Sequence, residues 1–446
     1  MAKNLNMTQG HPLKLLIQFA LPLMFGNMFQ QLYTVVDTAI VGQGVGMAAL
    51  AALGGVDWLN WMMVGIAQGF TQGFGVRISQ KYGEEDIPGL RRFMGQSAVL
   101  SAVLALVCVL LGQLALPIFL HFLRVPAELS GMAKTYTRIL FAGLPAVFFF
   151  NYCSAMLRAV GDSKTPLVAM AIAALLNIGL DVVAVFVLKW GVAGAAIATL
   201  LAQCVSGTIC LVKIFRTSFL RFNRQDLRID RQVVGNLIRI GTPSAAKNTI
   251  IAIGGMTIMT VVNTFGTAFI AGFTSTNKLY GLLEICALSY GFAVTTYVGQ
   301  NFGAGRFDRI RKGMKSAAIL AVATAVIIAT MMFVFGRSIT MLFISTDNVA
   351  DAAQAGNVAY RYLCIMSSWL PVLYILYLLF SALQGLGDTV RPMLSGLVEL
   401  GCRVSVAVAV AIIGRESGIF LAEIFAWTGA VIYLGYHFRK RMKKGI

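Results

Sequence analysis

LRAVGDSKTP (Leu157–Pro166) returns as LQGLGDTVRP (Leu383–Pro392), 226 residues further along the chain. Two more pairs of segments match in the same order. They are LLIQFALP with LIRIGTP, ending at Pro22 and Pro243, and ISQKYG with VGQNFG, ending at Gly83 and Gly303. Their spacings are 221 and 220 residues. Three matched landmarks in one order indicate an internal duplication, so the sequence predicts two homologous halves.

Long apolar segments separate these landmarks. Of the 446 residues, 58% are hydrophobic and only 12% are charged, against about 25% charged in soluble proteins. A helix needs about 20 apolar residues to cross the roughly 30 Å hydrocarbon core of a membrane. Continuous apolar runs favour helices over barrel strands. The sequence predicts an all-α polytopic membrane protein with twelve spans, at 13–40, 48–76, 92–121, 131–157, 164–188, 191–215, 233–264, 268–297, 314–341, 353–383, 391–413 and 416–437.

Lysine and arginine residues are distributed unevenly over the loops. One set of alternate loops, together with both termini, holds 26 of them, and the other set holds 6. Since cytoplasmic loops carry the excess of basic residues, both termini are predicted to be cytoplasmic. The net charge of +18 is thereby explained by topology, and no nucleic-acid partner is expected.

Each half contains six predicted spans, an even number, so both halves have the same orientation in the membrane. We expect an N-lobe at 1–217, a basic linker at 218–232 and a C-lobe at 233–446. A cleft between two such lobes that opens to each side in turn is typical of transporters. The pattern favours a transporter over a duplicated channel or scaffold.

Six acidic residues fall within the predicted spans: Asp37, Asp57, Asp181, Glu284, Glu399 and Glu423. A charge at mid-bilayer costs about 2.5–3.5 kcal/mol on insertion scales and marks a functional candidate. Asp37 is the strongest, because Gln30, Tyr33 and Asp37 share one helix face at spacings i, i+3 and i+7. A polar stripe on an otherwise apolar helix predicts a polar cavity.

A second polar pair lies on the fifth span. Asn177 and Asp181 are spaced i, i+4, and Thr199 ends the small-residue run that opens the sixth span. Small residues permit close helix approach. Two carboxylates, an amide and a hydroxyl could bind a monovalent cation, or the two carboxylates could hold a proton. A purely structural role for Asp181 is the alternative.

The second half carries a different set of charges. Glu399 and Arg403, at i, i+4 on the eleventh span, are predicted to neutralise each other. Glu284 is predicted to line a second-lobe cavity. Asp57 and Glu423 lie near span ends, where they are expected to reach water. Lys247 and Lys278 receive no assigned role.

Catalytic and cofactor motifs are missing from the sequence. Its seven cysteines form no CxxC, its three histidines lie in loops or near a terminus, and no GxxxxGK[ST] segment occurs. These observations argue against a disulfide framework, zinc, haem and a built-in ATPase. We expect no cofactor and no enzyme activity, and transport energy from an ion gradient or from the substrate's own gradient.

Several segments together resemble the MATE (multidrug and toxic compound extrusion) family over essentially the whole chain. They are the two GD-x-x-x-P loops quoted above, MFQQLYTVVDTAIVG (Met28–Gly42), NIGLDVV (Asn177–Val183) and GVAGAAIAT (Gly191–Thr199). The resemblance implies a V-shaped, monomeric antiporter of twelve helices. It also implies export of cationic, amphipathic drugs in exchange for Na⁺ or H⁺.

The resemblance also implies site residues. Those matching first-lobe cation positions are Asp37, Asn177, Asp181 and Thr199, and those matching the same cavity are Gln30 and Tyr33, with Asn151 as a looser addition. Many NorM-like relatives carry a glutamate eight residues after the proline of the seventh span, where this chain has Ile251. The sequence therefore looks closer to the MepA-like and DinF-like branches, with coupling on the first lobe.

One alternative function stays open on the same superfamily fold. A lipid-linked oligosaccharide flippase would need cationic side chains to bind a diphosphate. Lys247, Lys278 and Arg403 could supply them, so this hypothesis stays open. The physiological substrate and the choice between Na⁺ and H⁺ are also open, because oxygen ligands and carboxylates serve both ions.

Overall fold

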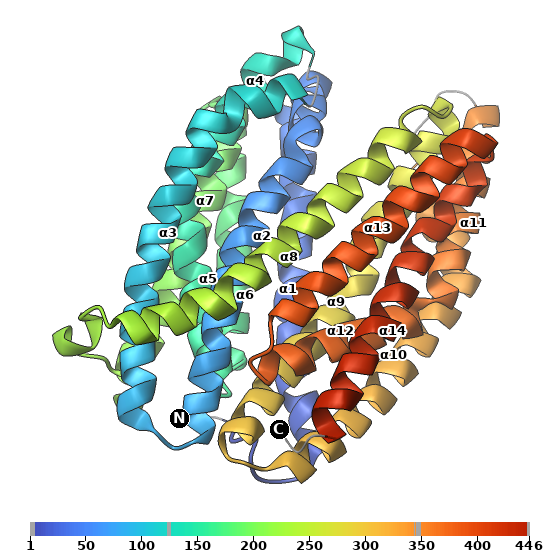
Figure 1. Ribbon diagram of the computed structural model, residues 1–446. Helices are drawn as coiled ribbons and strands as arrows, with labels where there is room; N and C mark the ends of the chain where they lie inside the picture. Colours follow the sequence, from blue (N-terminus) through green and yellow to red (C-terminus); the bar gives the residue numbers. More distant parts are fainter. Residues whose placement is uncertain (1–4, 123–125, 343, 345–348, 444–446) are drawn as a thin grey trace. The chain divides into compact units, whose positions relative to one another are not determined.

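The computed structural model describes residues 5–122, 126–342, 344 and 349–443, and within these residues every regular element is a helix (Figure 1). The α-helices are α1 Pro12–Gly44, α2 Met47–Gly83, α3 Ile87–Phe122, α4 Ala127–Ala142, α5 Leu144–Ala159, α6 Lys164–Val182, α7 Gly191–Arg216, α8 Arg231–Val262, α9 Thr267–Gly303, α10 Phe307–Met341, α11 Val349–Ser368, α12 Leu370–Gly385, α13 Val390–Ile413 and α14 Leu421–Lys443. Short helical turns complete the set: η1 Val183–Val187, η2 Ser218–Leu220, η3 Arg224–Leu227 and η4 Glu416–Phe420.

Among the described residues, ten of these helices are long and apolar enough to cross a membrane. Two further pairs, α4 with α5 and α11 with α12, each pass the same test together, which raises the number of candidate spans to twelve. The predicted all-α, multi-pass fold is therefore confirmed.

Two of the predicted spans are bent rather than continuous. The axes of α4 and α5 differ by 45°, and those of α11 and α12 by 51°. Pro145 and Pro371 each stand at the second position after the break. Proline lacks the N–H needed within a helix and its ring clashes with the preceding turn. The predicted spans at 131–157 and 353–383 therefore each correspond to a bent helix pair, with the bend at one of two prolines that the 226-residue repeat relates to each other.

The described residues form two compact units. Unit 1 contains residues up to Gln9, Gln18–Thr249 and Gly299–Gly305, and unit 2 contains Gly10–Ile17, Ile250–Val298 and the described residues from Arg306. Helices α1, α8 and α9 each contribute residues to both units. The lobe boundaries given above follow the sequence repeat and stay a prediction.

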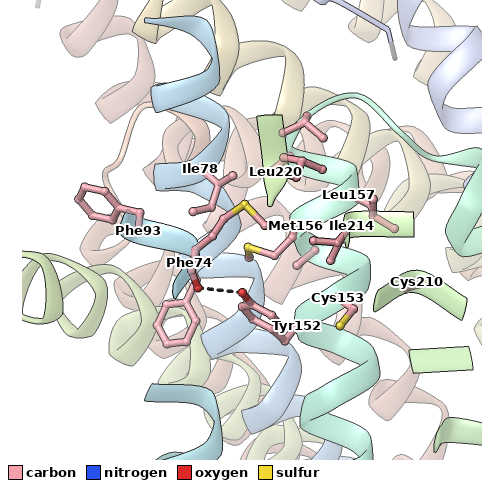
Figure 2. Close-up of a cluster of buried hydrophobic side chains, with 14 of the residues drawn as sticks. Phe74, Ile78, Phe93, Tyr152, Cys153, Met156, Leu157, Cys210, Ile214 and Leu220 are labelled. Atoms are coloured by element: carbon pink, nitrogen blue, oxygen red, sulfur yellow. Dashed lines mark hydrogen bonds between the residues drawn. The ribbon is translucent and has the colours of Figure 1, made fainter. Parts of the chain in front are cut away.

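The core of unit 1 is built between α2, α3, α5 and α7 (Figure 2). Phe74 and Ile78 of α2 meet Met156 and Leu157 of α5, and all four side chains are fully buried. Tyr152 of the same helix donates a hydrogen bond to the Met94 carbonyl of α3 at 2.8 Å. This apolar packing fixes α5 against its neighbours.

The basic segment after α7 is held against α3. Arg91 donates hydrogen bonds to the carbonyls of Ser218 (2.9 Å) and Phe219 (3.1 Å). Gln96 accepts one from the Asp230 N–H at 3.0 Å, and Arg92 forms an ion pair with Asp230. The predicted linker therefore has ordered partners within unit 1.

The last turn of α9 packs on the last turn of α2 within unit 1. A Cβ on Gly83 would lie 1.9 Å from the Gln300 carbonyl oxygen, and a Cβ on Gly303 would lie 2.0 Å from the Gln80 carbonyl oxygen. The two helices thus touch backbone to backbone. The contact is reciprocal, because the 220-residue repeat relates Gln80 to Gln300 and Gly83 to Gly303.

Side chains of α9 then join this contact to the N-terminal segment. Gln300 accepts a hydrogen bond from the Met7 N–H at 2.9 Å and donates one to the Ala159 carbonyl at 2.9 Å. Asn301 donates to the Met7 carbonyl at 3.0 Å. Both amides are fully buried, so three segments distant in sequence are fixed at one point.

Asp86 caps α3 in the loop after α2. Its carboxylate accepts a hydrogen bond from the Gly89 N–H at 2.9 Å and pairs with Lys81 at 2.9 Å. The hydrogen bond from Lys81, followed by that from Gly89, holds the pKa of Asp86 below its usual value.

Replacing Asp86 with Ala should lower the free energy of unfolding by about 1 kcal/mol at neutral pH, a typical cost for a lost N-cap. A carboxylate whose pKa is depressed by folding stabilises the protein above its unfolded pKa, about 3.9. That stability is lost as the pH falls through the lower folded value. Thermal unfolding of both proteins at pH 7 and near pH 3 tests this, and a difference that does not shrink with acid contradicts it.

Candidate cation-binding site

The polar face of α1 that the sequence predicts lies in unit 1. Asp37 is 9% exposed, and its Oδ1 atom makes no hydrogen bond with any described residue. Tyr33, one turn earlier, has its hydroxyl beside the side chains of Gln30 and Gln203 and within electrostatic range of Asp37. The predicted stripe of Gln30, Tyr33 and Asp37 is therefore a polar surface inside unit 1.

Asp181 and Asn177 lie on α6 and are fully buried. The two carboxylate oxygens of Asp181 and the side-chain oxygen of Asn177 have no hydrogen-bond partner among the described residues. The Asn177 amide donates a long hydrogen bond, 3.5 Å, to the Thr199 hydroxyl of α7. This contact joins two of the four residues predicted for the first-lobe cation site, Asn177 and Thr199, and Asp181 lies one helical turn after Asn177.

The local backbone changes just after Asp181. Helix α6 ends at Val182 and passes into the π-helical turn η1. Such turns widen a helix and recur at functional sites. An apolar cluster containing Val41 and Ala49 packs with Val185 of this turn and with Val192 and Ala195 of α7. It joins the ends of α1 and α6 that follow the two aspartates.

Asp37 and Asp181 lie close enough to repel each other electrostatically. None of the ion pairs found among the described residues involves either of them. A buried carboxylate without a compensating charge is costly, so this arrangement favours a proton or a bound cation. In the described part of the chain no cluster of three or more His, Cys, Asp or Glu side chains is gathered as for a metal centre.

Two residues of this site were missed by the sequence analysis. Tyr136 of α4 lies within electrostatic range of Asp37, Asp181 and Tyr33. Gln203 of α7 adjoins Tyr33. Gln203 follows Thr199 by four residues and could have been found by helical spacing. Tyr136 could not, because only the tertiary packing of α4 brings it to α1 and α6.

Two other residues predicted for a substrate cavity make different contacts. Asn151 of α5 is buried and donates a hydrogen bond to the Val147 carbonyl of its own helix at 2.9 Å. Glu284 belongs to unit 2, where it accepts hydrogen bonds from the hydroxyls of Tyr280, at 3.4 Å, and Tyr377. Their assignment to a substrate cavity stays a prediction.

Unit 2 holds a buried charge cluster between α13 and α14. Arg403 lies 3.6 Å from Glu399, the predicted partner. Its shorter contacts are with Glu423, at 3.0 Å from Nε and 2.8 Å from Nη2. The Glu423 side chain is only 17% exposed. Glu423 is therefore partly exposed and also pairs with Arg403, a contact that the sequence analysis did not predict, because α14 turns this carboxylate toward the guanidinium.

Comparison with known proteins places this chain in a class of multi-pass membrane transporters. The MatE family model matches residues 22–183 and 243–409. A probable multidrug resistance protein of Bacillus subtilis, YpnP, is 28% identical over 99% of each chain. An FAD transporter of Shewanella oneidensis is 24% identical over 75% of each chain.

A solved structure has the same fold. It is a MOP superfamily transporter from Pyrococcus furiosus, described as having a binding pocket of reverse polarity, with a TM-score of 0.93 at 22% identity. The match covers 100% of this chain and 99% of that one. The chain belongs to the MatE family, as the sequence resemblance predicted.

Proposed function

We propose that this protein is a secondary active multidrug efflux transporter that exports cationic or amphipathic compounds by antiport with H⁺ or Na⁺. The observation that carries the proposal is the pair of buried carboxylates, Asp37 and Asp181, which have unpartnered oxygens and no basic ion-pair partner among the described residues. We further propose that it acts as a monomer in a bacterial inner membrane, with both termini in the cytoplasm.

The negative charge of Asp37 and Asp181 also explains how the fluxes of the substrate and of the coupling ion are coupled. Asp37 and Asp181 stabilise one positive charge, from the coupling ion or from a cationic substrate, because both cannot stay ionised at low cost in an apolar lobe. A site that is empty carries uncompensated negative charge, which opposes its passage between access states. Only the loaded forms then exchange sides readily, and the two ligands move in opposite directions.

Two other substrates provide contrasting tests. A lipid-linked oligosaccharide requires basic groups for its diphosphate, but Arg403, one of the candidates, is engaged by Glu423 and Glu399. The relative described as an FAD transporter makes an anionic flavin the second control. Neither anion suits a site formed by two aspartates.

The decisive experiment uses the purified protein in liposomes. We expect uptake of a fluorescent cationic dye to be driven by an imposed Na⁺ gradient or by an imposed pH gradient, and thereby to identify the coupling ion. FAD and an isoprenoid diphosphate should not move under either gradient. Movement of one of these anions without dye transport would overturn the drug-export proposal.

A further inference from the structure

The duplication relates the cation site of unit 1 to the charge cluster of unit 2. The 226-residue spacing carries Lys164, the first residue of α6, to Val390, the first residue of α13. The same spacing carries Asn177 to Arg403. A guanidinium therefore stands at the position in the second repeat that an amide occupies in the first.

Both side chains make the same connection between helices. Asn177 reaches from α6 to Thr199 of α7, the next helix of its repeat. Arg403 reaches from α13 to Glu423 of α14, where it forms two parallel hydrogen bonds of 3.0 and 2.8 Å. Such bidentate pairs are strong and geometrically specific. The two positions are thus equivalent in sequence register and in structural role.

Residues of the first helix in each repeat are exchanged as well. The 221-residue spacing of the first landmark relates Tyr33 to Gly254 and Asp37 to Ile258. A Cβ on Gly254 would lie 3.1 Å from Nη1 of Arg403, so the missing side chain leaves room for the guanidinium. Where the first repeat carries a carboxylate on this helix, the second has an apolar residue that is 4% exposed.

The two repeats also differ in how their buried carboxylates are compensated. Asp37 and Asp181 have no ion-pair partner among the described residues, as noted above. Arg403 instead lies between two carboxylates, and its side chain is 6% exposed. Burying carboxylates without a countercharge is costly. In unit 2 the chain itself supplies the countercharge.

We propose that Arg403 is a tethered cation, occupying in the second repeat the position at which the first repeat binds the exchangeable coupling cation. The proposal rests on the function proposed above for Asp37 and Asp181. It assigns Arg403 a specificity-determining role, because a permanently bound guanidinium leaves the transporter with a single exchangeable cation site. The guanidinium then compensates one of the two negative charges of Glu399 and Glu423 throughout the transport cycle.

The test counts cations bound by the purified protein, using radioactive Na⁺ and, separately, the protons taken up from a lightly buffered solution. The wild type should bind one cation that Asp37→Asn abolishes. Arg403→Asn, which introduces the residue of the first repeat, should bind two. The double variant Asp37→Asn/Arg403→Asn should bind one, held by Glu399 and Glu423.

Two outcomes separate the proposals. A folded Arg403→Asn protein with no added cation, alone and in the Asp37→Asn background, overturns the tethered-cation proposal. A wild-type cation that persists in Asp37→Asn overturns the assignment of the first site, while the effect of Arg403→Asn can still be read. Arg403→Lys is the matched control, since it keeps the charge and should add no cation.

The reverse exchange gives a second test that does not require Arg403→Asn to fold. Asn177→Arg should bind no cation, because the guanidinium supplies the one positive charge that the cation otherwise brings to Asp37 and Asp181. Asn177→Met also fills the position but brings no charge. Without added cation, Asn177→Arg should unfold at a higher temperature than Asn177→Met, and the opposite order contradicts the proposal.

Discussion

Replacing Asp37 with Asn should abolish gradient-driven export while leaving the folded protein in the membrane. Asparagine keeps the shape of the side chain but removes the charge that stabilises a bound cation. Hydrogen bonds to charged groups contribute about 1.5–3 kcal/mol, so cation binding should weaken by about 10- to 100-fold. Dye uptake into proteoliposomes under the effective gradient should then fall to the level of protein-free vesicles.

The matched control for this variant is Glu128→Gln. Glu128 is an exposed carboxylate in the first turn of α4, and the change removes the same charge without touching the site. Its transport should equal that of the wild type. Full coupled export by Asp37→Asn would contradict the assigned role, provided that both variants are present in the vesicles in equal amounts.

Asp181→Asn distinguishes a site made of two carboxylates from one made of Asp37 alone. If the two carboxylates share one cation, removing either should give the same loss of coupled export. If Asp181 is only a structural partner, its variant should lose thermal stability and keep coupling. The burial of Asp181 and the lack of a hydrogen-bond partner for either of its oxygens favour the shared site.

The fold was predictable because membrane insertion imposes strong rules on sequence. Apolar length located the spans, and the internal repeat predicts their grouping into two halves. Two features escaped those rules. The bends at Pro145 and Pro371 fall within continuous apolar runs, and hydropathy has no signal for helix direction. Proline within a span can be accommodated in a helix, as Pro22 is in α1. The sequence alone therefore did not show which prolines bend their span.

The site was predictable where its residues share one helix. Asp37 follows Tyr33 by four positions, and Asp181 follows Asn177 by four, so helical periodicity found both pairs. Contacts between helices were not accessible in the same way. Tyr136 joins the site only through the packing of α4, and Glu423 joins Arg403 only through the rotation of α14 about its axis.

Replacing Gly83 with Ala should disrupt the backbone contact between α2 and α9, and this is the second large effect that we expect. The new Cβ would lie 1.9 Å from the Gln300 carbonyl oxygen, a distance that only backbone movement can relieve. Overpacking of this kind costs about 1–3 kcal/mol. Thermal unfolding of the purified variant should show that loss, and dye transport should fall with it.

The same helix contains a control. A Cβ on Gly54 would have no neighbour within 4 Å, and alanine in a helix interior is favoured over glycine by about 0.5–1 kcal/mol. Gly54→Ala should therefore be neutral or stabilising. Equal destabilisation by Gly54→Ala and Gly83→Ala would show that loss of backbone flexibility, and not the contact with Gln300, is responsible.

The repeat makes this prediction stricter. Gly303 meets the Gln80 carbonyl at 2.0 Å as Gly83 meets that of Gln300, so Gly303→Ala should destabilise the protein by a similar amount. Because both alanines act on one contact, the double variant should lose less than the sum of the two single losses. Additive losses would indicate two independent contacts.

The consequence for transport follows from the fact that this contact joins equivalent segments of the two repeats. A transport cycle in which the ends of α2 and α9 part must break this contact, which lies within unit 1, and form it again. A penalty of about 2 kcal/mol on the closed form changes the equilibrium by about 30-fold. Both alanine variants should therefore favour the form in which this end is open. A cysteine introduced beside Gln80 should be labelled faster in both variants than in the wild type, and its labelling rate should be unchanged in Gly54→Ala.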